Sequence, residues 1–112
     1  MNSVMLTAAQ ARNKSRNDNL IFNEIRNIEQ AILDAVDAGQ LEVYVAGTTM
    51  TDTGSGIAEA RVYSKVWQGV VDDRAKDQRM GSVIKYFTEL GYQIDRRTNP
   101  TTGDTFRWAI FW

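Results

Sequence analysis

Apolar residues recur at helical spacing in a long N-terminal stretch of the chain. Spacings of 4, 3, 4 and 4 place five aliphatic side chains on one stripe of a helix: Ile21, Ile25, Ile28, Ile32 and Val36. Residues 7–10 have the form of a capping box, and Gly39 suits the left-handed position past a last helical turn. The pattern predicts a helix over residues 8–38.

Residues 12–19 inside this stretch contain no apolar side chain. A helix that is polar on every side buries nothing, so residues 1–19 could form a solvated arm. Asp18 or Asn19 could equally cap a shorter helix. We expect one continuous helix with a solvated first third.

The pattern of apolar and polar residues changes several times in the middle of the chain. Residues 41–46 alternate apolar and mixed side chains, as a strand with one face on a core does. Residues 47–56 are rich in Gly, Ser and Thr and predict a flexible surface loop. Apolar residues at helical spacing then predict two further helices, over residues 57–70 and 72–90.

The C-terminal residues have the pattern of a β-hairpin. Alternating segments over residues 92–97 and 106–112 flank a turn at residues 99–103. The register that we expect joins one ion pair and two apolar pairs: Asp95 with Arg107, Ile94 with Trp108, and Tyr92 with Ile110.

The predicted order is helix, strand, helix, helix, strand, strand. It indicates an α+β fold in which a small antiparallel sheet of about three strands is covered on one face by helices. A chain of 112 residues suits a single domain. Leu, Ile, Val and Phe supply 26 residues against a net charge of −1, which places the chain among folded proteins.

The chain has no His and no Cys. This composition excludes Ser-His-Asp and Cys-His nucleophiles, disulfides and zinc sites of the usual ligands. Carboxylate, Lys, Tyr, Ser and Thr chemistry remains, but no pair of such residues stands at a recognisable spacing. We therefore expect a protein without catalytic activity, cofactor or metal.

Three arginines, Arg96, Arg97 and Arg107, lie among aromatic residues on the expected hairpin. Basic residues interleaved with aromatic ones on a sheet are typical of proteins that bind single-stranded nucleic acid. In the alternative interpretation the aromatic rings all face the core and Arg107 pairs with Asp95. The alternation and the lack of a basic excess favour this alternative.

A chain of this size has more apolar side chains than one small core needs to hold. A surplus apolar surface is commonly used as an interface, and helical stripes can pair with copies of themselves. The residues expected at an oligomer interface are Ile21, Ile25, Ile28, Tyr63, Val66 and Trp67. Packing of all six in the core of one chain is the alternative.

Asp72, Asp73 and Asp77 form an acidic cluster. Carboxylates can bind Mg²⁺, but no companion acid stands at a metal-binding spacing, so we expect Asp72 or Asp73 to cap a helix instead. The loop at residues 47–56 lacks the lysine of a phosphate-binding loop.

Residues 2–7 lack the basic and apolar regions of a secretory signal, and no apolar run approaches the roughly 20 residues of a membrane span. We expect a soluble, cytoplasmic protein.

Four short stretches resemble small uncharacterised proteins of tailed bacteriophages, including phages of marine cyanobacteria. They are Thr7-Ala8-Ala9-Gln10-Ala11-Arg12, Ala35 to Gly39, Gly91-Tyr92-Gln93-Ile94 and Trp108-Ala109-Ile110-Phe111-Trp112. The resemblance covers about the first 40 and last 25 residues, and residues 47–73 look like an addition to it. It implies a phage origin and an α+β fold, and it assigns no catalytic residues.

The sequence as a whole favours a non-enzymatic protein that acts through protein contacts. Its expected partner is a second copy of the chain or another phage protein. A nucleic-acid-binding module that uses the C-terminal hairpin is the alternative.

Overall fold

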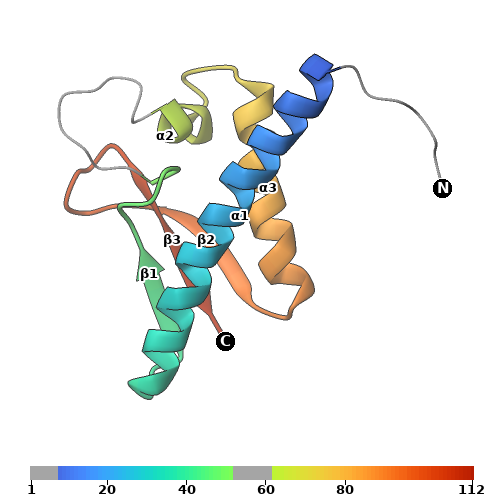
Figure 1. The fold of residues 1–112 in the computed structure, drawn as a ribbon. Coiled ribbons are helices and arrows are strands. Elements are labelled where there is room, and N and C mark those ends of the chain that lie inside the picture. The colour runs from blue at the N-terminus through green and yellow to red at the C-terminus, as the bar shows by residue number, and fades with distance from the viewer. Residues whose placement is uncertain (1–7, 52–61) are drawn as a thin grey trace.

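The computed structural model describes residues 8–51 and 62–112, with side chains from residue 18 onward (Figure 1). The elements along the chain are α1 (Ala8–Asp37), β1 (Glu42–Val45), α2 (Val62–Gln68), α3 (Arg74–Glu89), β2 (Gln93–Thr98) and β3 (Phe106–Phe111). The predicted α+β fold and its C-terminal hairpin are confirmed. Of the helix predicted over residues 57–70, residues 62–68 are helical, whereas residues 57–61 lie outside the described residues.

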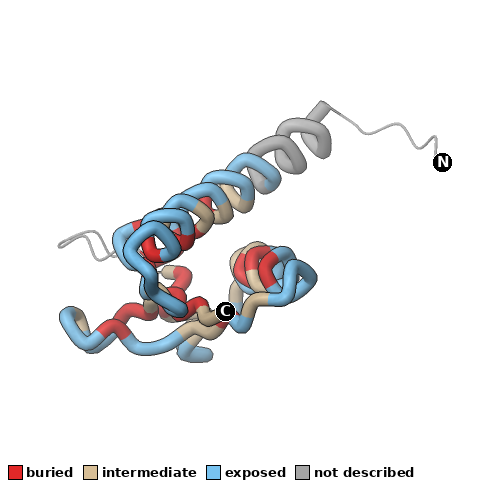
Figure 2. Tube along the Cα trace, turned by 90° about the horizontal axis from the view of Figure 1, so that it is seen from below, coloured by how far each residue is buried: buried red, intermediate tan, exposed pale blue. Residues whose placement is uncertain are grey.

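The three strands form an antiparallel sheet in the order β1-β3-β2. Helices α1 and α3 lie side by side over one face of this sheet, and the buried residues of both helices face it (Figure 2). Between helices and sheet lies a core made of twelve buried residues: Ile28, Ile32, Val45, Met50, Tyr63, Met80, Val83, Phe87, Ile94, Phe106, Trp108 and Ile110. The opposite face of the sheet, called the outer face below, carries none of the described helices (Figure 2).

Helix α1 is continuous, as expected, so Asp18 and Asn19 lie inside it and do not cap a shorter helix. Ile28 and Ile32 of its apolar stripe are buried against the sheet, whereas Val36 at the end of the stripe is 50% exposed and its neighbour Ala35 is buried instead. Its C-terminal end is closed by main-chain bonds from residues 38–40 back to the last turn, with Gly39 at a φ of 76°. The aliphatic period thus predicted the buried side of the middle of α1, where Ile28 and Ile32 lie.

The predicted hairpin register is wrong by two residues. In the structure Ile94 lies opposite Ile110, and Arg97 lies opposite Arg107. A shift of two residues keeps every side chain on its own face, because side chains alternate with period two. The expected buried face, with Trp108 and Ile110, is therefore confirmed even though the expected cross-strand pairs are not.

The prediction of a flexible surface loop over residues 47–56 is wrong for its first half. Thr48, Met50 and Thr51 are buried, and Met50 belongs to the core. The hydroxyl groups of Thr48 and Thr51 are hydrogen-bonded to each other at 2.6 Å. Their polar atoms are satisfied inside the protein, which lets a Thr-rich segment pack inward. Residues 52–56 lie outside the described residues.

Candidate functional site

The outer face of the sheet presents two arginines and two aromatic rings. Tyr44 on β1, Arg97 on β2, and Arg107 and Phe111 on β3 all project from it, because residues two apart on a strand share a face. We call these four residues the arginine–aromatic face. Ala109 lies at its centre and is fully buried by its neighbours.

Each arginine of this face lies over one ring. The Arg107 guanidinium carbon is 4.1 Å from the centroid of the Tyr44 ring, and that of Arg97 is 4.8 Å from the centroid of Phe111. The two rings meet edge to face, with centroids 6.2 Å apart. Arg97 and Arg107 lie opposite each other on neighbouring strands, where like charges repel. Because each guanidinium group packs on a different ring, the ring contacts offset part of this repulsion.

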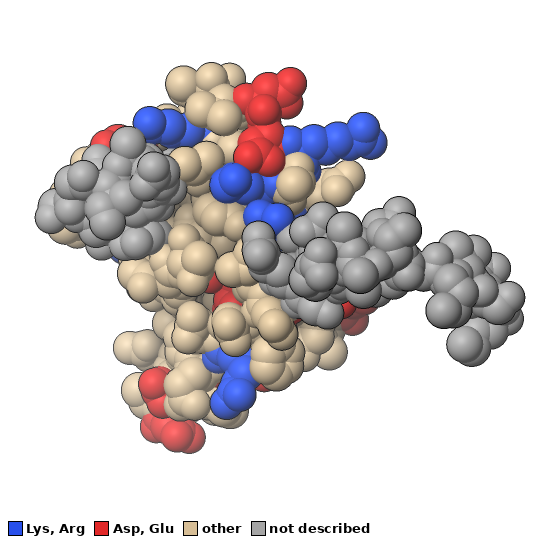
Figure 3. All heavy atoms as spheres, turned by 45° about the horizontal axis from the view of Figure 1, so that its top comes forward, with Lys and Arg blue, Asp and Glu red and all other residues tan. Residues whose placement is uncertain are grey.

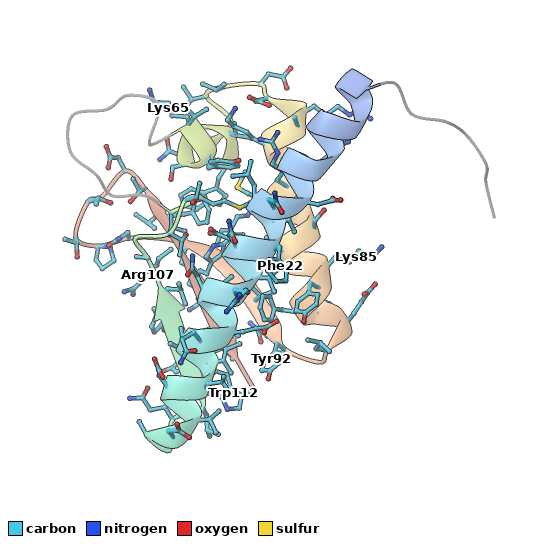
Figure 4. All side chains as sticks on the ribbon, viewed as in Figure 1. Phe22, Lys65, Lys85, Tyr92, Arg107 and Trp112 are labelled. Atoms are coloured by element: carbon cyan, nitrogen blue, oxygen red, sulfur yellow. The ribbon has the colours of Figure 1, made fainter. Side chains whose placement is uncertain are left out.

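The three arginines predicted from sequence to contact nucleic acid do not share one face. Arg96 lies on the helix-covered side, where its Nη1 is 3.7 Å from the sulfur of Met80. Arg97 forms an ion pair with Asp95 at 3.1 Å, so the predicted pairing of Asp95 with Arg107 is wrong. Among the described residues, Arg107 forms no ion pair and its buried Nε has no hydrogen-bond partner. Figure 4 shows Arg107 beside β1.

Helix α3 carries a second polar surface on its solvent side. Positions four, seven, eight and eleven residues after Arg74 lie on one side of a helix. The exposed residues of this side are Arg74, Gln78, Gly81, Ser82 and Lys85. Lys85 projects away from the rest of the molecule (Figure 4). A Cβ built on Gly81 would meet no atom within 4 Å, so this side of α3 is open at its centre.

Helices α2 and α3 contact each other and are joined by a short turn that contains Gly69 at a φ of 81°. Two hydrogen bonds connect α2 to the β2–β3 hairpin. The Phe106 amide donates to Ser64 Oγ at 3.1 Å, and Gln68 Nε2 donates to the Asp104 carbonyl at 2.9 Å. The α2–α3 pair and the hairpin therefore form one connected unit.

The acidic cluster caps a helix, as expected. Asp73 is the N-cap of α3, and its carboxylate accepts a hydrogen bond from the Lys76 amide at 3.1 Å. Hydrogen bonding to the Lys76 side chain, and then to its amide, lowers the pKa of Asp73 below the ordinary 3.8. Basic and acidic side chains alternate at this end of the molecule (Figure 3). Among the described residues, no three acidic side chains gather as a metal site would require.

Sequence reasoning did not single out the buried carboxylate of Glu24. It is 1% exposed and accepts hydrogen bonds from Trp108 Nε1 at 2.8 Å and Thr48 Oγ1 at 2.5 Å. The Met50 amide donates a third, longer bond of 3.4 Å. Burial raises the pKa of Glu24 above its ordinary 4.5. Glu24 thus ties α1 to β3 and to the segment after β1.

The residues expected at an oligomer interface all contribute to the core of this chain. Ile28 and Tyr63 are buried in it. The other four, Ile21, Ile25, Val66 and Trp67, are partly buried and pack against it. The surplus apolar surface lies elsewhere, with Leu41, Val70, Leu33 and Leu90 the most exposed apolar residues among those described.

No protein-family model, curated protein or solved structure matches this chain. None of the helices within the described ranges is both long and apolar enough to cross a membrane.

Proposed function

We propose that this protein binds duplex DNA and acts by binding and not by catalysis. The observation that carries the proposal is the solvent side of α3. It is polar or small at every position and packs against nothing described. Side chains of the types found there are those that read base edges in the major groove. Gln pairs with adenine, and Arg and Lys pair with guanine.

The surroundings of α3 support the same interpretation. Two helices joined by a short turn containing Gly form a helix-turn-helix unit, whose second helix enters the major groove with its N-terminal residues on the bases. Here α2 and α3 are that pair, and Arg74 and Gln78 stand in the N-terminal half of α3. The element order and the strand order β1-β3-β2 are also those of a winged helix-turn-helix, a likeness of topology only.

The charge on this surface predicts weak and mildly salt-dependent binding. Arg74 and Lys85 are the two basic residues on the solvent side of α3, and Lys85 forms an ion pair with Glu89 at 3.9 Å. If both side chains contact phosphates and not bases, the slope in a plot of log K against log salt concentration is roughly −2, which is the steepest that this surface allows. Binding should therefore be measured at low ionic strength.

The test is fluorescence anisotropy with a labelled duplex of mixed sequence at about 50 mM salt. Gly81→Leu places a bulky side chain at the centre of the proposed contact and should weaken binding roughly tenfold or more. Gly81→Ala is the matched control for helix propensity. Arg74→Ala on α3 should also weaken binding, and Arg26→Ala on α1 is its control for the loss of one positive charge. Gly81→Leu with unchanged affinity would refute the proposal.

The alternative nucleic-acid site on the hairpin can be separated in the same assay. Loss of binding in Arg97→Ala and Arg107→Ala, with the Gly81 variants unaffected, would assign binding to the arginine–aromatic face. A phage origin and a location in the host cytoplasm, where a duplex-binding protein meets DNA, remain part of the proposal. They are supported by the resemblance of the chain termini.

A further inference from the structure

Strand β1 is an edge of the sheet, and no described residue pairs with its outer side. The Trp112 amide donates to the Leu41 carbonyl at 3.1 Å, so Leu41 belongs to a hydrogen-bonded pair with β3. Hydrogen-bonded pairs alternate along an antiparallel ladder, so Val43 and Val45 also face β3. The main-chain groups of Glu42 and Tyr44 therefore point to the open edge.

This edge is short, with four residues and the single charged side chain of Glu42, and its flanks expose apolar surface. Leu41 is 70% exposed and Tyr44 is 40% exposed. An open groove of about 780 Å³ runs along residues 39–44 and the end of β3. The other edge of the sheet, β2, carries Asp95, Arg96 and Arg97, and charged side chains of this kind discourage edge pairing. The two edges thus differ, and β1 is the one suited to a partner strand.

We propose that β1 pairs antiparallel with β1 of a second copy of this chain, with the two-fold axis at Val43. In this antiparallel register, each residue lies opposite the partner residue that is equally far from Val43 on the other side. Glu42 faces Tyr44 of the partner subunit in a hydrogen-bonded pair, which uses the main-chain groups that point outward. On the other face, Val43 meets the partner's Val43, and Leu41 meets the partner's Val45. The exposed apolar residue Leu41 is covered in this arrangement.

Charge complementarity favours a second copy over an unrelated strand. Glu42 is exposed and forms no hydrogen bond or ion pair with the described residues. Arg107 lies over the Tyr44 ring and has no acidic partner among them. When Glu42 of the partner subunit lies opposite Tyr44, its carboxylate stands beside the Arg107 guanidinium. The two-fold symmetry forms this ion pair twice.

The pairing joins two three-stranded sheets into one of six strands and presents two copies of α3. Dimeric helix-turn-helix proteins bind two half-sites in this manner. This consequence rests on the proposed function, whereas the pairing itself does not require nucleic acid.

The first test is the mass of the full chain by size-exclusion chromatography with light scattering, without nucleic acid. We expect a dimer whose dissociation constant rises roughly tenfold or more in Glu42→Arg and in Arg107→Glu, because each places like charges together. The double variant Glu42→Arg with Arg107→Glu restores opposite charges and should recover dimerisation. Circular dichroism verifies that each variant is folded.

A cross-linking test places the axis independently. The chain has no Cys, so Val43→Cys should form an intermolecular disulfide under mild oxidation, because the side chains of a non-hydrogen-bonded pair lie close. Gln93→Cys, on the opposite edge, is the control: it should still dimerise but should form no intermolecular disulfide. A strict monomer at high concentration, or a dimer that is indifferent to Glu42→Arg and not cross-linked at position 43, overturns the proposal. Neither result depends on whether the protein binds DNA.

Discussion

Replacing Glu24 by Ala removes the acceptor at the centre of the buried network. Trp108 is fully buried, and its Nε1 has Glu24 as its partner at 2.8 Å. Thr48 and Thr51 keep the hydrogen bond between their hydroxyl groups at 2.6 Å, but one hydroxyl proton of this pair and the Met50 amide also lose Glu24 as their acceptor. Glu24→Ala should therefore act by leaving buried donors without an acceptor, above all the Trp108 indole N–H.

The expected loss follows from two contributions. An unsatisfied buried donor costs about 1–3 kcal/mol, and the lost methylene costs about 0.8 kcal/mol. Relief of the buried negative charge offsets part of this loss. We expect Glu24→Ala to lower the free energy of unfolding by about 2–4 kcal/mol near neutral pH. Glu24→Gln keeps the shape and one acceptor oxygen and should cost about 1 kcal/mol.

The pH dependence gives a second, independent signature. Burial raises the pKa of Glu24 in the folded state above 4.5, so the folded protein binds this proton more tightly than the unfolded chain does. Stability from this group is greatest below 4.5 and falls as pH rises through the folded-state pKa. Glu24→Gln cannot titrate and should lack this decline.

The assay is urea unfolding followed by tryptophan fluorescence at several pH values between about 4 and 7. Gln30→Ala, which removes an exposed hydrogen bond on α1, is the control and should change stability by less than about 0.5 kcal/mol. If Glu24→Ala is no more destabilising than this control, the network does not hold α1 to the sheet.

Three further predictions concern the α2–α3 unit. Gly81→Ala should raise the free energy of unfolding by about 1 kcal/mol in the same assay, because the added methyl meets open space; a loss of stability would contradict this. Ser64→Ala leaves the Phe106 amide, the first of β3, without its acceptor and should lower the free energy of unfolding by about 1–3 kcal/mol. The control Ser82→Ala removes an exposed hydrogen bond and should change the free energy of unfolding very little. Hydrogen bonds to Lys76 lower the pKa of Asp73, so its stabilisation is present above 3.8 and is lost as pH falls below it. Thermal melts of Asp73→Ala should lack this acid-dependent loss, and Asp73→Asn should retain the cap.

Local patterns were sufficient to predict the elements and their buried sides. The aliphatic stripe of α1, the cap at Asp73 and the alternation in β3 each depend on residues close in sequence. Helical and strand periods act over a few residues, so they can be recognised without knowing the fold. The order of elements and the α+β class followed from them.

The candidate site could be predicted only in part. Arg97 and Arg107 were identified as candidates, but Tyr44, on a strand more than fifty residues earlier, was not linked to them. Glu24 and Thr48 resemble ordinary surface residues in the sequence. Their burial depends on Trp108, which no local pattern places beside them.

The sequence by itself determined which residues form helices and strands and which side of each is apolar. Tertiary structure decided the hairpin register, the burial of Glu24 and the contrast between the two edges of the sheet. The physical reason is that side chains alternate between the two faces of a strand, so the sequence determines which face each side chain occupies. A shift of the partner strand by two residues leaves every side chain on the same face, so the alternation does not determine the register. Register and edge exposure are instead set by packing between residues distant in the chain, and so they emerge only when the sheet and helices assemble.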